Sequence, residues 1–172
     1  MKLHQYNIQT TWTGNRGEGT QDYKAYDRSH VIRMEGKADI LGSSDAAFRG
    51  DKSKHTPEDL FVSTLSTCHM LWYLHLCALN GVVVLEYIDN ATGLMEEESN
   101  GSGRFTKVIL SPKVIVSENS MIEKANELHG EAHRMCFISN SVNFQVVHEP
   151  VASVQQVLGI RYKGIRNKDS RG

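Results

Sequence analysis

The chain has 172 residues, the length of a single domain, and 40% hydrophobic with 23% charged residues is the composition of a soluble globular protein. A formal net charge of -1 provides no electrostatic attraction to nucleic acid or an anionic membrane, which argues against both as partners. We therefore expect one domain over residues 1–172, with a basic tail from about residue 159.

The first twelve residues, MKLHQYNIQTTW, contain no apolar run long enough for the core of a signal peptide, which predicts a cytoplasmic protein. The apolar stretch 60–79 approaches membrane-spanning length but carries His69, His75 and several hydroxyl side chains. A buried core helix is the better interpretation. Three cysteines without an export signal favour reduced, reactive thiols over a structural disulfide framework.

Strand signals come first along the chain. Tyr6, Ile8, Thr10 and Trp12 alternate with polar residues, which predicts a strand that ends at the turn of residues 14–17. Two weaker strand signals cover residues 21–26 and 30–34. Residues 36–55 mix Gly, Ser, Asp and Lys without a sustained period, and we expect a long loop there.

A strong helix signal follows. Thr56 offers an N-cap hydroxyl, Pro57 suits the first helical position, and Glu58 and Asp59 place negative charge at the positive end of the helix dipole. Apolar residues then occur on all sides through residue 79, before the Asn-Gly stop at 80–81. Such a helix should be buried on all sides, which in so small a domain argues for a partner subunit.

The second half predicts a hairpin, a helix and a strand. Residues 82–88 and 104–116 are rich in β-branched residues and should pair antiparallel. Apolar residues then recur at steps of three and four in an amphipathic helix (Ile122, Ala125, Leu128, Ala132, Met135), and residues 144–148 form a last strand. The expected fold is α+β, in the order β-β-β-α-β-β-α-β.

Helix geometry limits which cysteines can pair. Cys68 and Cys77 are nine positions apart in one helix, roughly 13 Å and on opposite faces, which is too far for a disulfide. Cys77 is most simply a small core residue. Cys68 and Cys136 lie on separate predicted helices, and packing these helices together permits a pair without requiring it.

A reactive Cys68 needs a nearby cation, because a thiolate in an apolar helix is otherwise unfavourable. Glu58 can hold an arginine, but it lies ten residues before Cys68, roughly 15 Å along the axis. One guanidinium reaches both residues only if Glu58 comes from a second, antiparallel copy of the helix. The candidate cations in loops are Arg16, Arg28, Arg33 and Arg49.

Two segments carry a resemblance to a known family. TPEDLFVSTLSTC and, about seventy residues later, EAHRMCFISN resemble the two signatures of the OsmC/Ohr family, the osmotically inducible and organic hydroperoxide resistance proteins. The resemblance extends over roughly residues 12–149. It implies an OsmC-like intertwined homodimer with antiparallel sheets wrapped around two long central helices. Phe137 stands where the family has a proline.

The resemblance also implies the chemistry. Cys68 matches the peroxidatic thiol of a two-cysteine peroxidase, Cys136 the resolving thiol, and Glu58 the residue that orients an arginine, best matched by Arg16. The enzyme would reduce organic hydroperoxides in oxidative stress defence, with no cofactor or metal, through a disulfide that an external lipoyl or thioredoxin dithiol reduces. Four apolar residues would favour organic hydroperoxides over hydrogen peroxide if they line the mouth of the site: Phe61, Leu65, Trp72 and Phe137.

Two alternatives remain open. His129 and His133 are four positions apart, Cys136 follows one turn later, and Cys68 or His69 would complete four ligands of a zinc-binding protein. The other alternative is a noncatalytic dimer of the same fold that binds a small apolar ligand.

Overall fold

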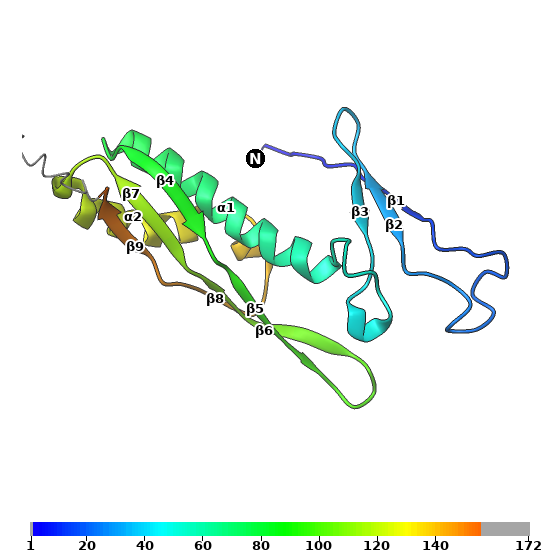
Figure 1. Cartoon of the computed structure of the whole chain (residues 1–172). Helices are drawn as coiled ribbons and strands as arrows, with labels where there is room; N and C mark the ends of the chain where they lie inside the picture. Colours follow the sequence, from blue (N-terminus) through cyan, green and yellow to red (C-terminus); the bar gives the residue numbers. More distant parts are fainter. Residues whose placement is uncertain (1, 156–172) are drawn as a thin grey trace, which may run out of the picture.

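The computed structural model describes residues 2–155, and its first unit is a small antiparallel sheet. Strands β1 (Gln9–Trp12), β2 (His30–Arg33) and β3 (Ile40–Gly42) are ordered β1-β2-β3, with Val31 opposite both Thr11 and Leu41. Figure 1 shows this sheet beyond the N-terminal end of the long helix. All of β1 is exposed, so the sheet has little core of its own.

Two N-terminal expectations are wrong in detail. Residues 21–26 form turns instead of a strand, because the Asp22 carboxylate accepts a hydrogen bond from the Lys24 amide and the Arg28 guanidinium lies 4.2 and 4.3 Å from the ring centres of Tyr23 and Tyr26. The third strand, β3, instead lies in the stretch expected to be a loop. The 3-10 turn η1 (Ala46–Phe48) occupies the same stretch.

Helix α1 (Pro57–Leu79) begins as the sequence predicts. The Thr56 hydroxyl accepts a hydrogen bond from the Asp59 amide, and the Asp59 carboxylate accepts one from the Thr56 amide. Within one chain, however, α1 buries a single stripe (Leu65, His69, Tyr73, Cys77). Its other sides remain open, with Leu71 63% exposed, so burial on all sides is not met by this chain alone.

The predicted hairpin is confirmed, but its first strand continues beyond residue 88 to residue 97, and each of its two long strands breaks in the middle. The first comprises β4 (Val84–Asp89) and β5 (Thr92–Glu97), the second β6 (Gly103–Leu110) and β7 (Pro112–Val116). At the break, the Asp89 carboxylate accepts hydrogen bonds from the Ser111 amide (2.7 Å) and the Ser66 hydroxyl of α1 (2.5 Å). This carboxylate therefore joins the hairpin to the helix.

The C-terminal strands complete both halves of this sheet. β8 (Gln145–His148) pairs parallel with β6, and β9 (Val151–Val154) pairs parallel with β7, giving the orders β5-β6-β8 and β4-β7-β9. If each broken strand of the hairpin is counted once, the element order is the one predicted, with β9 as an additional strand at the end. The expected basic tail lies outside the described residues.

Helix α2 (Ile122–Met135), between the 3-10 turns η2 (Asn119–Met121) and η3 (Ser139–Ser141), packs beside α1 against the sheet (Figure 1). Its buried side chains are Ala125, Leu128, His129 and Ala132, close to the predicted stripe. They form the core with Tyr73 and Cys77 of α1 and Val114 and Val116 of β7. Among the described residues, no helix is both long and apolar enough to cross a membrane.

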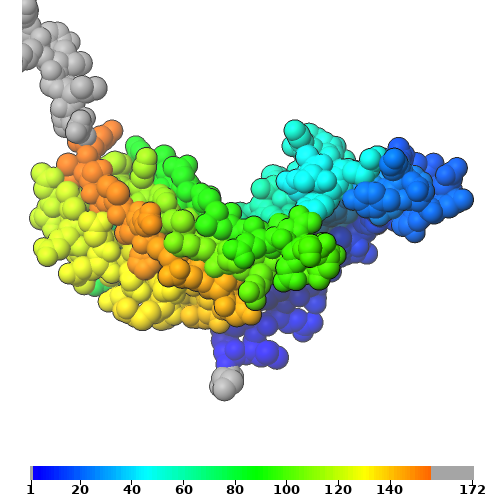
Figure 2. All heavy atoms as spheres, turned by 90° about the horizontal axis from the view of Figure 1, so that it is seen from below, coloured from blue at the N-terminus to red at the C-terminus, as the bar shows by residue number. Residues whose placement is uncertain are grey.

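The overall shape is uneven. Figure 2 shows the N-terminal residues as a separate lobe, with a hollow between it and the body that contains the two helices and the long strands. Several large apolar side chains of this lobe face outward, among them Tyr6, Ile8, Trp12 and Leu41, the last 54% exposed. This much open apolar surface is typical of a protein that associates with another chain.

Candidate active site

The fold brings Cys68 and Cys136 together. Cys68 lies in the middle of α1, and Cys136 is the first residue after α2, which packs beside it. The Cys68 side chain lies close enough to Cys136 to raise its pKa, and both thiols are free. Cys68 is partly exposed, whereas Cys136 is 1% exposed. One thiol of the pair is thus open to solvent and the other is covered.

The surroundings of Cys136 favour the protonated thiol over the thiolate. Burial, followed by the hydrogen bond with Cys68, raises the pKa of Cys136 to about 11. The chain turns into η3 directly after this residue, so the Ser139 amide donates a hydrogen bond to the Cys136 sulfur at 3.4 Å. The Ser139 hydroxyl in turn lies 3.4 Å from Nδ1 of His133. Cys136 is therefore a thiol at neutral pH, in a turn fixed from two sides.

The two helices that carry the thiols also carry a buried pair of histidines, one of which, His69, directly follows Cys68. His69 Nε2 and His129 Nδ1 are 3.0 Å apart, and the His129 ring stacks on Tyr73 with a 3.8 Å centroid separation. Burial lowers the pKa of His69 to about 4 and that of His129 to about 3, so both are neutral at pH 7. Their outer nitrogens, Nδ1 of His69 and Nε2 of His129, have no hydrogen-bond partner among the described residues.

An aromatic pair accompanies the thiol pair. Trp72 follows Cys68 by one helical turn, and Phe137 follows Cys136 directly. Their rings meet edge to face, with centroids 5.7 Å apart and planes at 82°. Phe137 is 68% exposed. The open side of the site is thus aromatic.

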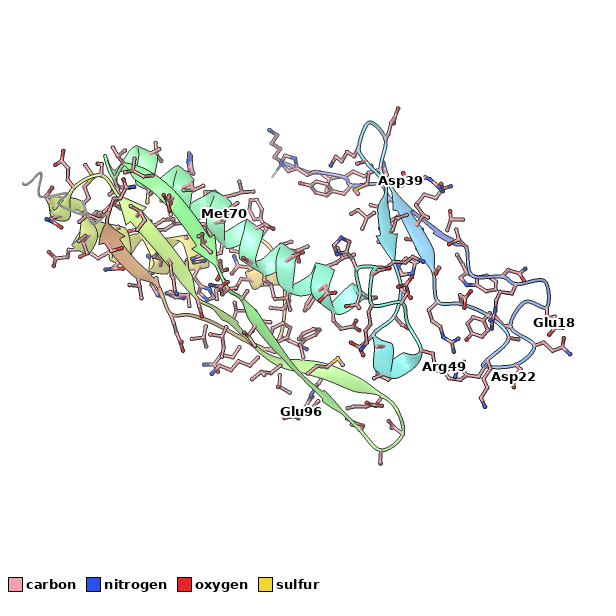
Figure 3. All side chains as sticks on the ribbon, viewed as in Figure 1. Glu18, Asp22, Asp39, Arg49, Met70 and Glu96 are labelled. Atoms are coloured by element: carbon pink, nitrogen blue, oxygen red, sulfur yellow. The ribbon has the colours of Figure 1, made fainter. Side chains whose placement is uncertain are left out.

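The arginine candidates lie elsewhere in this chain. The Arg16 guanidinium bonds to the carbonyls of Lys24 and Ala25 in the N-terminal turn, and within residues 2–155 no ion pair joins it to Glu58. Arg28 is held between two tyrosine rings, and Arg33 is paired with Asp39 at 3.2 Å. Figure 3 shows Arg49 in the loop after η1.

Glu58 lines an open cavity near the start of α1. This cavity has a volume of about 780 Å³ and lies between α1, η1 and the β5–β6 pair. None of the residues that line it is basic. Five of them carry carboxylates: Asp45, Glu58, Asp59, Asp89 and Glu97. A cation brought to Glu58 would meet no competing positive charge there.

Comparison with known proteins identifies the family. The family model described as OsmC-like protein matches residues 50–150, more than half of the chain. The chain belongs to the OsmC family. A solved OsmC-like protein of unknown function from Vibrio cholerae is 33% identical, with a TM-score of 0.78, and the match covers 87% of this chain and 100% of that chain.

More distant structures share the OsmC fold. An organic hydroperoxide resistance protein from Elizabethkingia anophelis is 20% identical with a TM-score of 0.63, and one from Legionella pneumophila is 15% identical with a TM-score of 0.65. Each match covers 90% of this chain and 100% of the other. A search of the curated proteins finds no match.

One of the four residues expected at the mouth of the site, Leu65, differs from that expectation. Leu65 has no exposed surface, because it packs against Val108 and Leu110 of β6, so it cannot touch a substrate in this chain. Phe61 packs against Phe105 and Phe144, at centroid separations of 5.0 and 5.9 Å. Leu65 therefore belongs to the core, Phe61 is partly buried against that core, and Trp72 and Phe137 lie beside the thiols in sequence.

The zinc alternative lacks a ligand set. His129 is bonded to His69 and His133 to Ser139, and among residues 2–155 no group of three or more His, Cys, Asp or Glu side chains could hold a metal ion. Sequence reasoning missed two features of this OsmC-family site, the His69–His129 pair and the Ser139 amide. The histidine spacing hinted at the first, whereas a backbone donor leaves no signal in the sequence.

Proposed function

We propose that this OsmC-family protein is a thiol peroxidase that reduces organic hydroperoxides, with Cys68 as the attacking thiol and Cys136 as the resolving thiol. The observation that carries the proposal is the contact between these two thiols from separate helices. Their unequal access supports the assignment, because a peroxide reaches the partly exposed Cys68 before the buried Cys136. The hydroperoxide resistance proteins among its structural relatives agree with this chemistry.

The reaction balances with the groups present and an external dithiol. The Cys68 thiolate attacks the terminal oxygen of the hydroperoxide, the O–O bond breaks, and the alkoxide leaves as an alcohol after taking a proton. Cys68 is then a sulfenic acid. Cys136 attacks its sulfur, the S–S bond forms and water leaves, carrying the thiol proton. A dithiol of the lipoyl or thioredoxin type then reduces the Cys68–Cys136 disulfide by thiol–disulfide exchange and is itself oxidised to a disulfide. We place this cycle in the cytoplasm.

We propose further that the active unit is an intertwined homodimer in which one domain, residues 1–172, forms each subunit. The exposed apolar residues of the β1–β3 lobe and the open sides of α1 support this assembly. In the dimer, Arg16 would be brought beside Glu58 and the Cys68 thiolate. The acid-lined cavity at Glu58 has the charge that would hold this guanidinium.

The test is oxidation of the reduced protein by one equivalent of cumene hydroperoxide, followed by peptide mapping with mass spectrometry. We expect a disulfide between Cys68 and Cys136, and cumyl alcohol in equal amount. Cys136→Ser should stop at a Cys68 sulfenic acid that dimedone traps, and Cys68→Ser should leave the peroxide unreduced. Cys77→Ser is the matched control and should behave as the parent. A parent protein that leaves the peroxide intact would refute the proposal.

A further inference from the structure

Cys136 lies at the end of a helix that disfavours a negative charge. It directly follows Met135, the last residue of α2, and the negative end of the helix dipole opposes a charge on its sulfur. Reactive cysteines are more often activated at helix N-termini. Cys136 must nevertheless become a nucleophile when it attacks the Cys68 sulfenic acid. The groups that favour its thiolate therefore have to come from the turn that follows.

That turn provides a backbone donor. The Ser139 amide donates a hydrogen bond to the Cys136 sulfur at 3.4 Å, and a donor at the sulfur favours the charged form. Burial of the thiol, followed by Cys68, raises the pKa of Cys136, and the backbones of Ser139 and Ile138 partly lower it again. The reactivity of Cys136 thus depends on how firmly the turn holds this amide in place.

Asn140 ties the turn to α2. Its side-chain amide donates a hydrogen bond to the Arg134 carbonyl (3.0 Å), and its backbone amide donates one to the Cys136 carbonyl (3.0 Å). A longer contact of 3.4 Å joins the Ser139 hydroxyl to Nδ1 of His133. The turn is therefore fixed to the end of α2 at the residue that carries the amide and at the residue after it.

Capping of the helix alone does not explain the Asn140 side chain. The Arg134 carbonyl is one of the last carbonyls of α2, which have no partner inside the helix. Both residues are exposed, so water can satisfy this carbonyl and the bond contributes little to folding. Its larger effect is on position, because without it the turn is free to move the Ser139 amide away from the sulfur.

We infer that Asn140 is a positioning residue for the resolving step, because it holds the turn in which the Ser139 amide contacts the Cys136 sulfur. This inference rests on the proposed peroxidase function and adds a residue that governs its second step. In that step the two sulfurs bond, the S–O bond of the sulfenic acid breaks, and its hydroxyl leaves as water with the thiol proton. The hydrogen bonds that carry the inference all form within one chain.

The size of the effect follows from thiol reactivity. A hydrogen bond to a charged group changes a pKa by about one to two. For each increase of one in the pKa, the thiolate fraction falls about tenfold while the thiolate becomes about threefold more nucleophilic. Loss of the amide contact should therefore slow the resolving step about 3- to 10-fold at neutral pH. The deficit should shrink as the pH approaches the pKa of the thiol.

The experiment follows the two steps separately. Reduced protein is mixed with one equivalent of cumene hydroperoxide and quenched at intervals with dimedone, and mass spectrometry quantifies the Cys68 sulfenic acid and the disulfide. In Asn140→Ala the sulfenic acid should form at the parent rate, whereas the disulfide should form about 3 to 10 times more slowly at pH 7.5 and with a smaller deficit at pH 9.5. A purely structural role would give no such dependence on pH.

Asn143→Ala removes another exposed asparagine, three residues later, and should match the parent in both steps. The titratable groups beside Cys136 and its turn, Cys68 and His133, are present in each of these proteins and affect them equally. A parent rate of disulfide formation in Asn140→Ala, or a deficit that is the same at both pH values, would overturn the inference and leave the peroxidase proposal intact.

A second measurement does not involve peroxide. In protein that carries Cys68→Ser and Cys77→Ser, the reaction of Cys136 with methyl methanethiosulfonate is followed as a function of pH. Adding Asn140→Ala should move this profile to higher pH, by about one to two. If the profile moves but the parent leaves cumene hydroperoxide unreduced, the peroxidase function is wrong. If the parent is active and the profile stays in place, only the role of Asn140 is wrong.

Discussion

The two thiols of the site differ most in their access to solvent. Cys136 is covered and keeps its proton up to about pH 11, whereas Cys68 is partly exposed. Alkylation requires an accessible thiolate, so iodoacetamide at pH 7.5 should label Cys68 well before Cys136. Peptide mapping over time checks this order. Faster labelling of Cys136 would reverse the assignment of the two roles.

The buried histidine pair should make the fold sensitive to acid. In the unfolded chain both side chains titrate near pH 6.5, whereas the folded protein lowers the pKa of His69 to about 4 and that of His129 to about 3. Between these values the unfolded state binds more protons, so stability is full above pH 6.5 and falls as the pH decreases toward 4. For two protons the slope approaches about 2.7 kcal/mol per pH unit.

Urea unfolding at pH 7, 6 and 5 measures this slope. His129→Asn removes one of the two groups and should reduce the slope by about half, whatever it does to stability at pH 7. His75→Asn alters an exposed histidine of α1 and serves as the control, with the same dependence of stability on pH as the parent. An unchanged slope in the His129 variant would show that the pair does not control acid unfolding.

At the scale of the elements, Asp89 connects α1 to the broken hairpin. Its carboxylate accepts two hydrogen bonds, from the Ser66 hydroxyl and the Ser111 amide. Asp89→Ala should lower the free energy of unfolding by about 2–3 kcal/mol, because it removes two bonds to a charged acceptor. Ser66→Ala should cost about 1 kcal/mol. Urea unfolding measures both, with the exposed Glu86→Ala expected to stay within about 0.5 kcal/mol of the parent.

Elements whose causes are local were predictable from the sequence. The Thr56 cap, Pro57 and the Asn-Gly stop indicate α1, and two segments rich in β-branched residues indicate the long hairpin. The strand predicted for residues 21–26 was wrong, because Arg28 stacks on two tyrosines and stabilises a turn that strand propensity does not reveal. Strand β9 was not predicted, and it is held at the sheet edge by its parallel pairing with β7.

The candidate site shows the same division. The motifs singled out Cys68 and Cys136, and the structure places the two side chains close together. The burial of Leu65 could not be predicted, because the sequence does not show which side of the helix packs against β6. The neutral His69–His129 pair depends on two helices packing side by side, which no local pattern encodes.

At the scale of the whole molecule, the N-terminal lobe lacks cover for its apolar residues. Leu41→Glu places a charge on this lobe and should weaken the proposed homodimer by at least tenfold in Kd, because a buried leucine contributes about 1.5–3 kcal/mol. Light scattering after size-exclusion chromatography measures the mass over a dilution series. Leu94→Glu is the control: it lies next to Gly93, which faces α1, and so points away from the helices.

A parent protein that is monomeric at all concentrations would contradict the dimer. In that case Arg16 would have no route to the thiols. The rate of Cys68 oxidation in Leu41→Glu provides a second readout, and it should decrease together with the dimer fraction if the guanidinium comes from the partner.

The parallel pairing of β8 with β6 and of β9 with β7 has a consequence for synthesis of the protein. These strands are the last described elements of the chain, yet each forms one edge of a sheet over which the helices pack. The β5-β6-β8 sheet cannot be completed before residue 148 is synthesised, nor the β4-β7-β9 sheet before residue 154, and pairings of long sequence separation form slowly. Until then the core around Cys68 is incomplete, so we expect the Cys68 thiol of the nascent chain to be open to oxidation before Cys136 lies beside it.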